Sequence, residues 1–174
     1  MAISSVKARR SHNAQSDMGQ LLVNYNNDRL YRTLGSAALG IKAGSSAIAK
    51  TTEPITILVN GVLVAIADNT DCATLSGTIT AAEYNCWLIS TSDGSTLTAT
   101  QGTAGASFAA VTIPAVPAGE TAVGIVVATK SDGTFTGGTT ALDAANTTVT
   151  YINIIGGFPK VIANGAGSAF SATV

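Results

Sequence analysis

The strongest hydrophobic pattern in the chain is a pair of β-branched runs, residues 55–59 and 62–66, separated by Asn60-Gly61. Asn-Gly is the dipeptide best suited to a type I′ turn, in which both central residues take a positive φ. The pattern therefore predicts a β-hairpin over residues 55–66. Both runs are apolar at almost every position, so both faces of the hairpin should be covered, as at the centre of a sandwich or at a subunit interface.

A second hairpin is predicted where residues 84–91 and 95–101 flank the tripeptide Ser92-Asp93-Gly94. In the second run Thr alternates with Leu or Ala, which is the period of a strand with two different faces. The Asp-Gly turn between the runs is expected to set their register.

Further strands follow at short spacing. Residues 123–129, Ser131-Asp132-Gly133 and residues 134–136 repeat the strand, turn and strand arrangement, and residues 147–155 supply a last strand. Shared turn chemistry explains this repeat better than an internal duplication does. At least six strands with no convincing helix between them predict an all-β fold, with an antiparallel β-sandwich or jelly-roll-like body.

Charge divides the chain into unlike parts. Seven cations and two acids give residues 1–50 a net charge of +5, whereas two cations and eight acids give the rest of the chain −6. This split predicts an extended, basic N-terminal docking arm over residues 1–50 and a β-sandwich body over residues 51–157. Residues 158–174 form a Gly/Ala-rich C-terminal tail.

Two features are expected within the arm. Met18, Leu21, Leu22 and Tyr25 have the i, i+3, i+4, i+7 spacing of a short amphipathic helix, which should end at the two asparagines that follow. Residues 34–50 are rich in Gly, Ala and Ser and have neither the helical nor the strict strand period. They should form an extended segment that lies against another surface.

The composition lacks surface charge. Charged residues make up 11% of the chain, against about 25% in ordinary soluble domains. Such a surface is expected to be covered by partners or to depend on Thr and Asn for solubility. The first twenty residues contain no apolar run of signal-peptide length, and the uncharged residues 94–119 are too rich in Thr, Ser, Gly and Pro for a membrane span. We therefore expect cytosolic synthesis and no membrane partner.

The candidate catalytic residues are few. His12 is the single histidine and lies in the polar arm, which leaves Ser-His-Asp and Cys-His systems without a base. Cys72 and Cys86 cannot complete a zinc site without further ligands, and cytosolic synthesis favours free thiols over a disulfide. The sequence therefore favours a protein that is not an enzyme and has no cofactor.

Two short patterns with acidic residues each allow two interpretations. Asp68 and Asp71 are possible calcium ligands, but their spacing matches no calcium loop and favours an Asx turn after the first hairpin. Thr80 and Glu83 imitate a helix capping box, yet a strand-like run follows, so a tight turn entering a strand is favoured.

The basic arm raises the question of its partner. Three cations within residues 7–10 lack interleaved aromatic residues and make a weak nucleic-acid footprint. Protein interfaces favour Arg and Tyr. We therefore predict that the arm docks on a protein rather than on nucleic acid, through Arg9, Arg10, Arg29, Tyr31 and Arg32.

Several of these segments together resemble a known family. The segments are Leu-Val-Asn-Gly-Val-Leu-Val at residues 58–64, Tyr-Asn-Cys-Trp-Leu-Ile-Ser at 84–90 with its Ser-Asp-Gly turn, and Ile-Pro-Ala-Val-Pro-Ala-Gly at 113–119 leading to Gly-Ile-Val-Val at 124–127. Over residues 35–156 the chain is similar to the β-domain of tailed-bacteriophage virion structural proteins, which include head decoration (cement) proteins, head fibres and tail-fibre-like modules. The resemblance implies a virion part, often a homotrimer, and carries no catalytic residue.

The resemblance and the basic arm together suggest a capsid decoration protein that binds the major capsid protein at the capsid surface and stabilises the shell by mass action. Self-association into a homotrimer would use the apolar strands. The alternative is a head or tail fibre module that binds a receptor or glycan. That alternative needs exposed aromatic residues for sugar stacking, whereas Trp87 lies within a predicted strand, where burial is expected.

Overall fold

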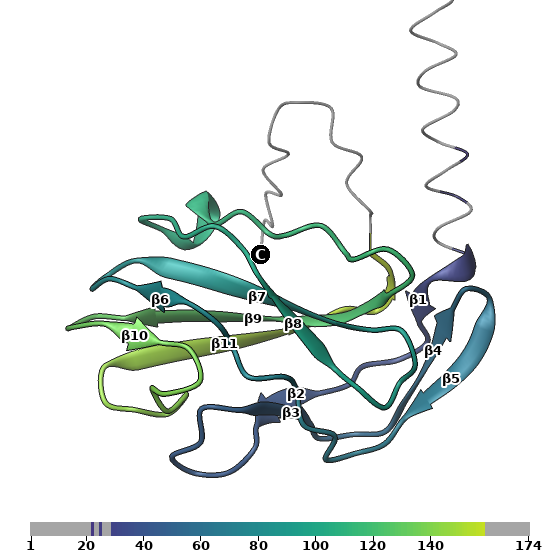
Figure 1. Cartoon of the computed structure of the whole chain (residues 1–174), viewed down its shortest axis with the longest axis horizontal. Coiled ribbons are helices and arrows are strands. Elements are labelled where there is room, and N and C mark those ends of the chain that lie inside the picture. Colours follow the sequence, from purple (N-terminus) through teal and green to yellow (C-terminus); the bar gives the residue numbers. More distant parts are fainter. Residues whose placement is uncertain (1–21, 23–24, 26–28, 159–174) are drawn as a thin grey trace, which may run out of the picture.

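The computed structural model describes Leu22, Tyr25 and residues 29–158 of the chain, and it is an all-β sandwich (Figure 1). The first sheet has the strand order β12 (Gly156–Gly157), β1 (Arg32–Thr33), β4 (Ile55–Val59), β5 (Val62–Ile66). The second sheet has the order β11 (Thr147–Asn153), β9 (Thr121–Lys130), β7 (Tyr84–Thr91), β8 (Thr98–Gln101). Neighbouring strands within both sheets are antiparallel.

Two short ribbons complete the body. One pairs β2 (Leu39–Ile41) with β3 (Ala49–Thr51), and the other pairs β6 (Thr78–Ile79) with β10 (Phe135–Thr136). A single turn of 3₁₀ helix, η1 (Phe108–Ala110), lies in the long connection between β8 and β9.

The first predicted hairpin is confirmed as β4 and β5. Asn60 and Gly61 have φ values of 52° and 77°, which is the pair of positive angles that a type I′ turn requires. The five-residue pairing runs from Ile55 opposite Ile66 to Val59 opposite Val62.

The second predicted hairpin is confirmed as β7 and β8, with a longer turn than expected. Asp93 Oδ1 accepts hydrogen bonds from the backbone N–H groups of Ser95 and Thr96, both at 2.9 Å. These bonds hold residues 95 and 96 in the turn, so β8 begins only at Thr98. The last predicted strand is confirmed as β11.

The predicted pairing of residues 134–136 with the preceding strand is wrong. Both edges of β9 are occupied by β7 and β11, and residues 135–136 pair with β6 instead. Burial of an aromatic side chain explains the difference. Phe135 is fully buried, and its ring centroid lies 5.7 Å from that of Trp87.

The main core lies between the two sheets. Ile55, Ile57 and Val59 of β4 contribute one side, and Trp87 and Ile89 of β7 contribute the other. A β-bulge at residue 123 leaves that residue without a partner in β7, because Ile89 lies opposite residue 124 and Ser90 opposite residue 122. Since strand faces alternate, this extra residue exchanges the two faces of β9.

The two sheets differ in how their outer faces are covered. Cys86, Leu88, Ile125 and Val127 point to the outer side of the second sheet, where they form a separate buried cluster with Val111, Ile113 and Val116 of the β8–β9 connection. The expected covering of both hairpin faces does not hold for β5. Val62 and Leu63 are 63% and 65% exposed.

The second half of the predicted arm contains β1, β2 and β3. Strand β1 pairs with β4 and β12, and Asn153 Oδ1 accepts a hydrogen bond of 2.9 Å from the backbone N–H of Leu39. The segment of residues 34–50 therefore lies against the body, as its composition predicted. From Arg32 onward the chain is part of the sandwich.

Candidate docking surface

The described residues offer little for catalysis. Cys72 and Cys86 are free and buried, and burial raises the pKa of the Cys72 thiol to about 12 and that of Cys86 to about 11. Both thiols are therefore protonated at neutral pH. No group of three or more His, Cys, Asp or Glu within the described residues is placed to hold a metal ion. His12 lies outside these residues.

Asp68 and Glu83 lie in or beside turns, whereas Asp71 forms an antiparallel β-bridge with Lys50. Asp68 Oδ2 accepts a hydrogen bond from the Asn69 side chain, and Asp71 pairs with Lys42 at 2.5 Å. Glu83 accepts hydrogen bonds from the N–H and the hydroxyl of Thr80, while the Glu83 N–H donates to the Thr80 carbonyl. The prediction of a tight turn before β7 is confirmed.

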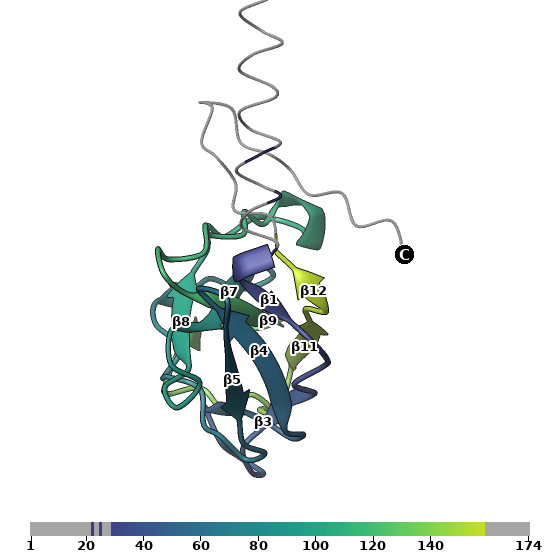
Figure 2. The same cartoon turned by 90° about the vertical axis from the view of Figure 1, so that its right-hand side faces the viewer.

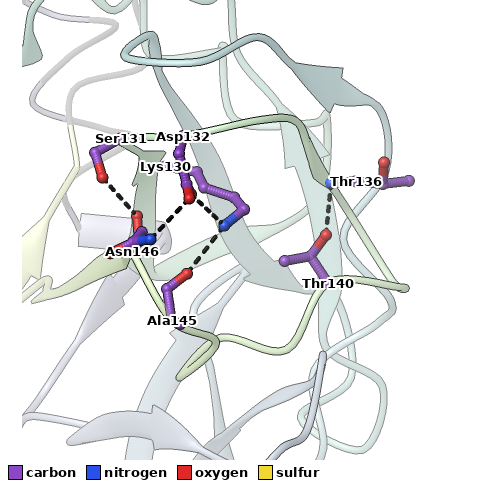
Figure 3. A network of polar contacts seen from close by, with 7 residues as sticks. All are labelled: Lys130, Ser131, Asp132, Thr136, Thr140, Ala145 and Asn146. Carbon is purple, nitrogen blue, oxygen red and sulfur yellow. Dashed lines mark hydrogen bonds and ion pairs between the residues drawn. The ribbon is translucent and has the colours of Figure 1, made fainter.

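A polar network closes the loop between β9 and β11 (Figure 3). Asp132 accepts from Lys130 Nζ and from Asn146 Nδ2, each at 2.8 Å, and Lys130 Nζ also donates to the Ala145 carbonyl at 2.9 Å. The bonds from Lys130 and Asn146 hold the pKa of the Asp132 carboxyl below its usual value. An ionised carboxylate that already has two donors serves to fix the loop, and the network holds no activated nucleophile.

The root of the arm is exposed and partly apolar. Leu22 and Tyr25 are helical, as predicted, and so are Arg29 and Leu30, beyond the predicted helix end. Leu22 and Tyr25 are 58% and 59% exposed. The Arg29 guanidinium carbon lies 5.6 Å from the centroid of the Tyr25 ring, a cation–π contact between residues one helical turn apart.

The helical residues join the body at the β4–β5 turn. The Leu30 carbonyl accepts a hydrogen bond of 2.9 Å from the Gly61 N–H, and a side chain on Gly61 would lie 3.2 Å from Leu30 Cδ2. Tyr31 is half-buried against the main core. Tyr31 and Leu30 therefore fix where Arg29 and Arg32 emerge from the sandwich.

Arg32 lies on the outer face of the first sheet. It is opposite Leu58, which is itself opposite Leu63. Cross-strand partners share a face, so these three side chains form one row. Arg32 Nε is buried and has no acceptor among the described residues. Figure 2 shows β1, β4 and β5 side by side, with the purple helical turn next to β1.

Of the five predicted docking residues, Arg29 is exposed, Arg32 lies on the outer face of the first sheet, and Tyr31 packs against the main core. Arg9 and Arg10 lie outside the described residues. The prediction missed the neighbouring apolar residues Leu34, Leu58, Val62 and Leu63. Their signal was present in the sequence as the lack of alternation in the hairpin runs, which indicates either core or interface on both faces.

Trp87 is confirmed as a core residue. Its side chain is fully buried, and its indole N–H donates to the Ser76 carbonyl at 2.9 Å. This ring is therefore not available to stack on a sugar. Within the described part of the chain, no helix is both long and apolar enough to cross a membrane.

The comparisons with known proteins return no relative. Neither a protein-family model, nor a curated protein, nor a solved structure matches this chain. The functional argument therefore depends on the sequence and the geometry.

Proposed function

We propose that this chain is a virion structural protein, a capsid decoration or cement protein that binds the major capsid protein through its N-terminal arm and stabilises the shell. The observation that carries the proposal is the exposed helical surface of Leu22, Tyr25 and Arg29, which protrudes from a well-packed body at the root of the basic arm. An exposed aromatic ring beside an arginine is typical of interface anchors.

The body supplies a rigid support for that arm. Tyr31 packs on the main core and the Leu30 carbonyl accepts a hydrogen bond from the β4–β5 turn, so the point where the chain enters the sandwich is fixed. The body is proposed to act without catalysis and without a cofactor. Self-association into a homotrimer through apolar strands is part of the same proposal.

Such a protein stabilises a shell by mass action, because each bound copy favours the assembled capsid over dissociated capsomers. Residues 1–50 carry the positive charge and the rest of the chain the negative charge. The arm is therefore the part suited to an acidic shell surface. The virion surface is the proposed location, after synthesis in the host cytoplasm.

The direct test is binding of the protein to undecorated capsids. Deletion of residues 1–28 leaves Tyr31 and β1 in the sandwich, so the shortened chain should fold and yet lose its occupancy on capsids. A finer variant combines Tyr25→Ala with Arg29→Ala. Its matched control is Phe108→Ala, which also removes a partly exposed aromatic ring, at a distance from the arm.

We expect the double variant to reduce occupancy at least tenfold and Phe108→Ala to leave it unchanged, since a few anchors carry most of the binding energy. Undiminished occupancy after deletion of residues 1–28 would exclude the arm as the docking element. The mass of the free protein in solution tests the trimer separately.

A further inference from the structure

The outer face of the first sheet carries apolar side chains, two of which, Leu34 and Leu63, are exposed. Arg32, Leu58 and Leu63 form a row across it, and Gly157 of β12 extends the row on the other side of Arg32. Leu34, whose N–H donates to the Thr56 carbonyl, is 50% exposed beside this row. The matching face of the second sheet has no such exposed residues, because its outer side chains form a buried cluster.

Arg32 shows that the face lacks an acceptor. Its Nε atom is buried, and no described group accepts its hydrogen. A buried donor without an acceptor costs free energy, so native structures nearly always satisfy such groups. A covering segment that brings carbonyl or hydroxyl oxygens to Arg32 would remove this cost.

We propose that residues 159–174 of the same chain lie across this face. The segment begins immediately after β12, which is an edge strand of the first sheet. From β12 to β5 there are three strand spacings, about 14 Å. Sixteen extended residues span up to about 50 Å, so the segment is long enough to cross the whole sheet.

The composition of the segment fits an apolar face. Lys160 is its single charged residue, and Phe170-Ser-Ala-Thr-Val174 alternates apolar with polar residues. In an extended conformation Phe170, Ala172 and Val174 share one side. In the proposed arrangement, their backbone carbonyls and the neighbouring hydroxyls would offer acceptors to Arg32.

Two other segments of the chain help to judge whether residues 159–174 suit this face. The uncharged connection containing Val111, Ile113 and Val116 already covers the outer face of the second sheet, so this body uses a charge-poor segment in the same way elsewhere. Residues 1–21 are less suited, because they include Lys7, Arg9, Arg10 and Asp17, and covering an apolar face with them would cost charge desolvation.

Attachment to the same chain favours the intramolecular arrangement over a second copy. A short flexible linker gives a tethered segment an effective concentration of about millimolar at a site it can reach. A neighbouring molecule at micromolar concentration competes poorly with this. The inference does not depend on the proposed function, and at Arg32 it assigns the missing acceptor to the tail instead of to the capsid.

The test measures how accessible the face is in the full-length protein. Leu63→Cys places a thiol in the row, while the native Cys72 and Cys86 remain buried. The control is Thr148→Cys, at an exposed position on β11 in the second sheet. We expect a maleimide to label residue 63 on the order of tenfold more slowly than residue 148, because a covered site reacts only after local opening.

Deletion of residues 159–174 should bring the two labelling rates together. Replacement of Phe170 and Val174 by Ser should do the same in a chain of full length, whereas replacement of Ser171 and Thr173 by Ala should preserve the protection. Equal labelling rates at residues 63 and 148 in the protein that keeps its tail would overturn the proposal. Protection that disappears on dilution from micromolar to nanomolar would assign the cover to a second copy and would also overturn it.

Discussion

Phe135 provides a stringent test of the observed strand pairing, because the sequence pattern alone placed its strand beside the wrong neighbour. The side chain is fully buried in the main core, beside the ring of Trp87. Replacement of a buried Phe by Ala removes its apolar contacts and leaves a cavity, which costs about 3–5 kcal/mol. Phe135→Ala should therefore remove a large part of the total stability, which is about 5–15 kcal/mol for a domain of this kind.

Phe108→Ala is the matched control. The same side chain is removed from η1, where it is 46% exposed and lies outside both buried clusters. The loss expected there is below about 1 kcal/mol, as for most surface substitutions. The difference between the two variants isolates the burial of Phe135 from the intrinsic effect of the substitution.

Urea unfolding followed by fluorescence and by far-ultraviolet circular dichroism measures both losses. Trp87 is the single tryptophan, so its emission reports on the core between the sheets. With a slope of about 2 kcal/mol per molar urea, the midpoint of Phe135→Ala should fall by roughly 1.5–2.5 M. A fall of less than 0.5 M, or one equal to that of Phe108→Ala, would refute the packing described for β10.

Three further predictions concern turns and thiols. Gly94→Ala and Gly133→Ala both place Ala at a positive φ, but a methyl at residue 94 would lie 2.4 Å from a side-chain atom of β5, whereas nothing lies within 4 Å at residue 133. We expect Gly94→Ala to be the more destabilising by about 1–3 kcal/mol, and equal urea midpoints would contradict this. Backbone N–H groups lower the pKa of the Asp93 carboxyl, so this group stabilises the fold above its unfolded pKa and stops doing so as the pH falls through the lower folded value. The thermal midpoint of Asp93→Ala should thus lie below that of the parent protein at pH 7, and the gap should close below about pH 4; a gap independent of pH would count against the turn. Cys72 and Cys86 should resist Ellman's reagent at pH 8 in the native protein and react as two thiols per chain in denaturant, so rapid native reaction would contradict their burial.

Local turn chemistry explains which parts of the fold could be predicted. Asn60, Gly61 and Gly94 take positive φ angles that few residues adopt readily, and both predicted hairpins form at these turns. The partner of Phe135 is a different matter. It is set by the contact with Trp87, far away in the chain, and no periodicity in residues 134–136 reveals this contact.

The candidate surface could be predicted only in part for a related reason. The mixture of Arg29, Tyr31 and Arg32 indicated a protein-binding segment, yet Tyr31 packs against the main core, while Arg32 lies on the outer face of the first sheet. The apolar residues Leu58 and Leu63 belong to the β4–β5 hairpin, which lies farther along the chain. Only the pairing of β1 with β4 brings them beside Arg32, and this pairing leaves no local signal in either segment.

The two sheets have similar apolar patterns, yet only one of them has a covered outer face, and this difference locates the part of the molecule that meets other surfaces. Residues 103–119 cover the outer side chains of β7 and β9, while Leu63 on the outer face of β5 is 65% exposed. The open face lies at the end of the body where β1 begins and β12 ends (Figures 1 and 2). Both terminal segments therefore connect to the body next to its exposed apolar residues.

The Lys130–Asp132 network fixes the loop between β9 and β11 at the other end. Binding to a capsid and covering by the tail would thus involve the same end of the sandwich, and experiments on either one should retain both termini.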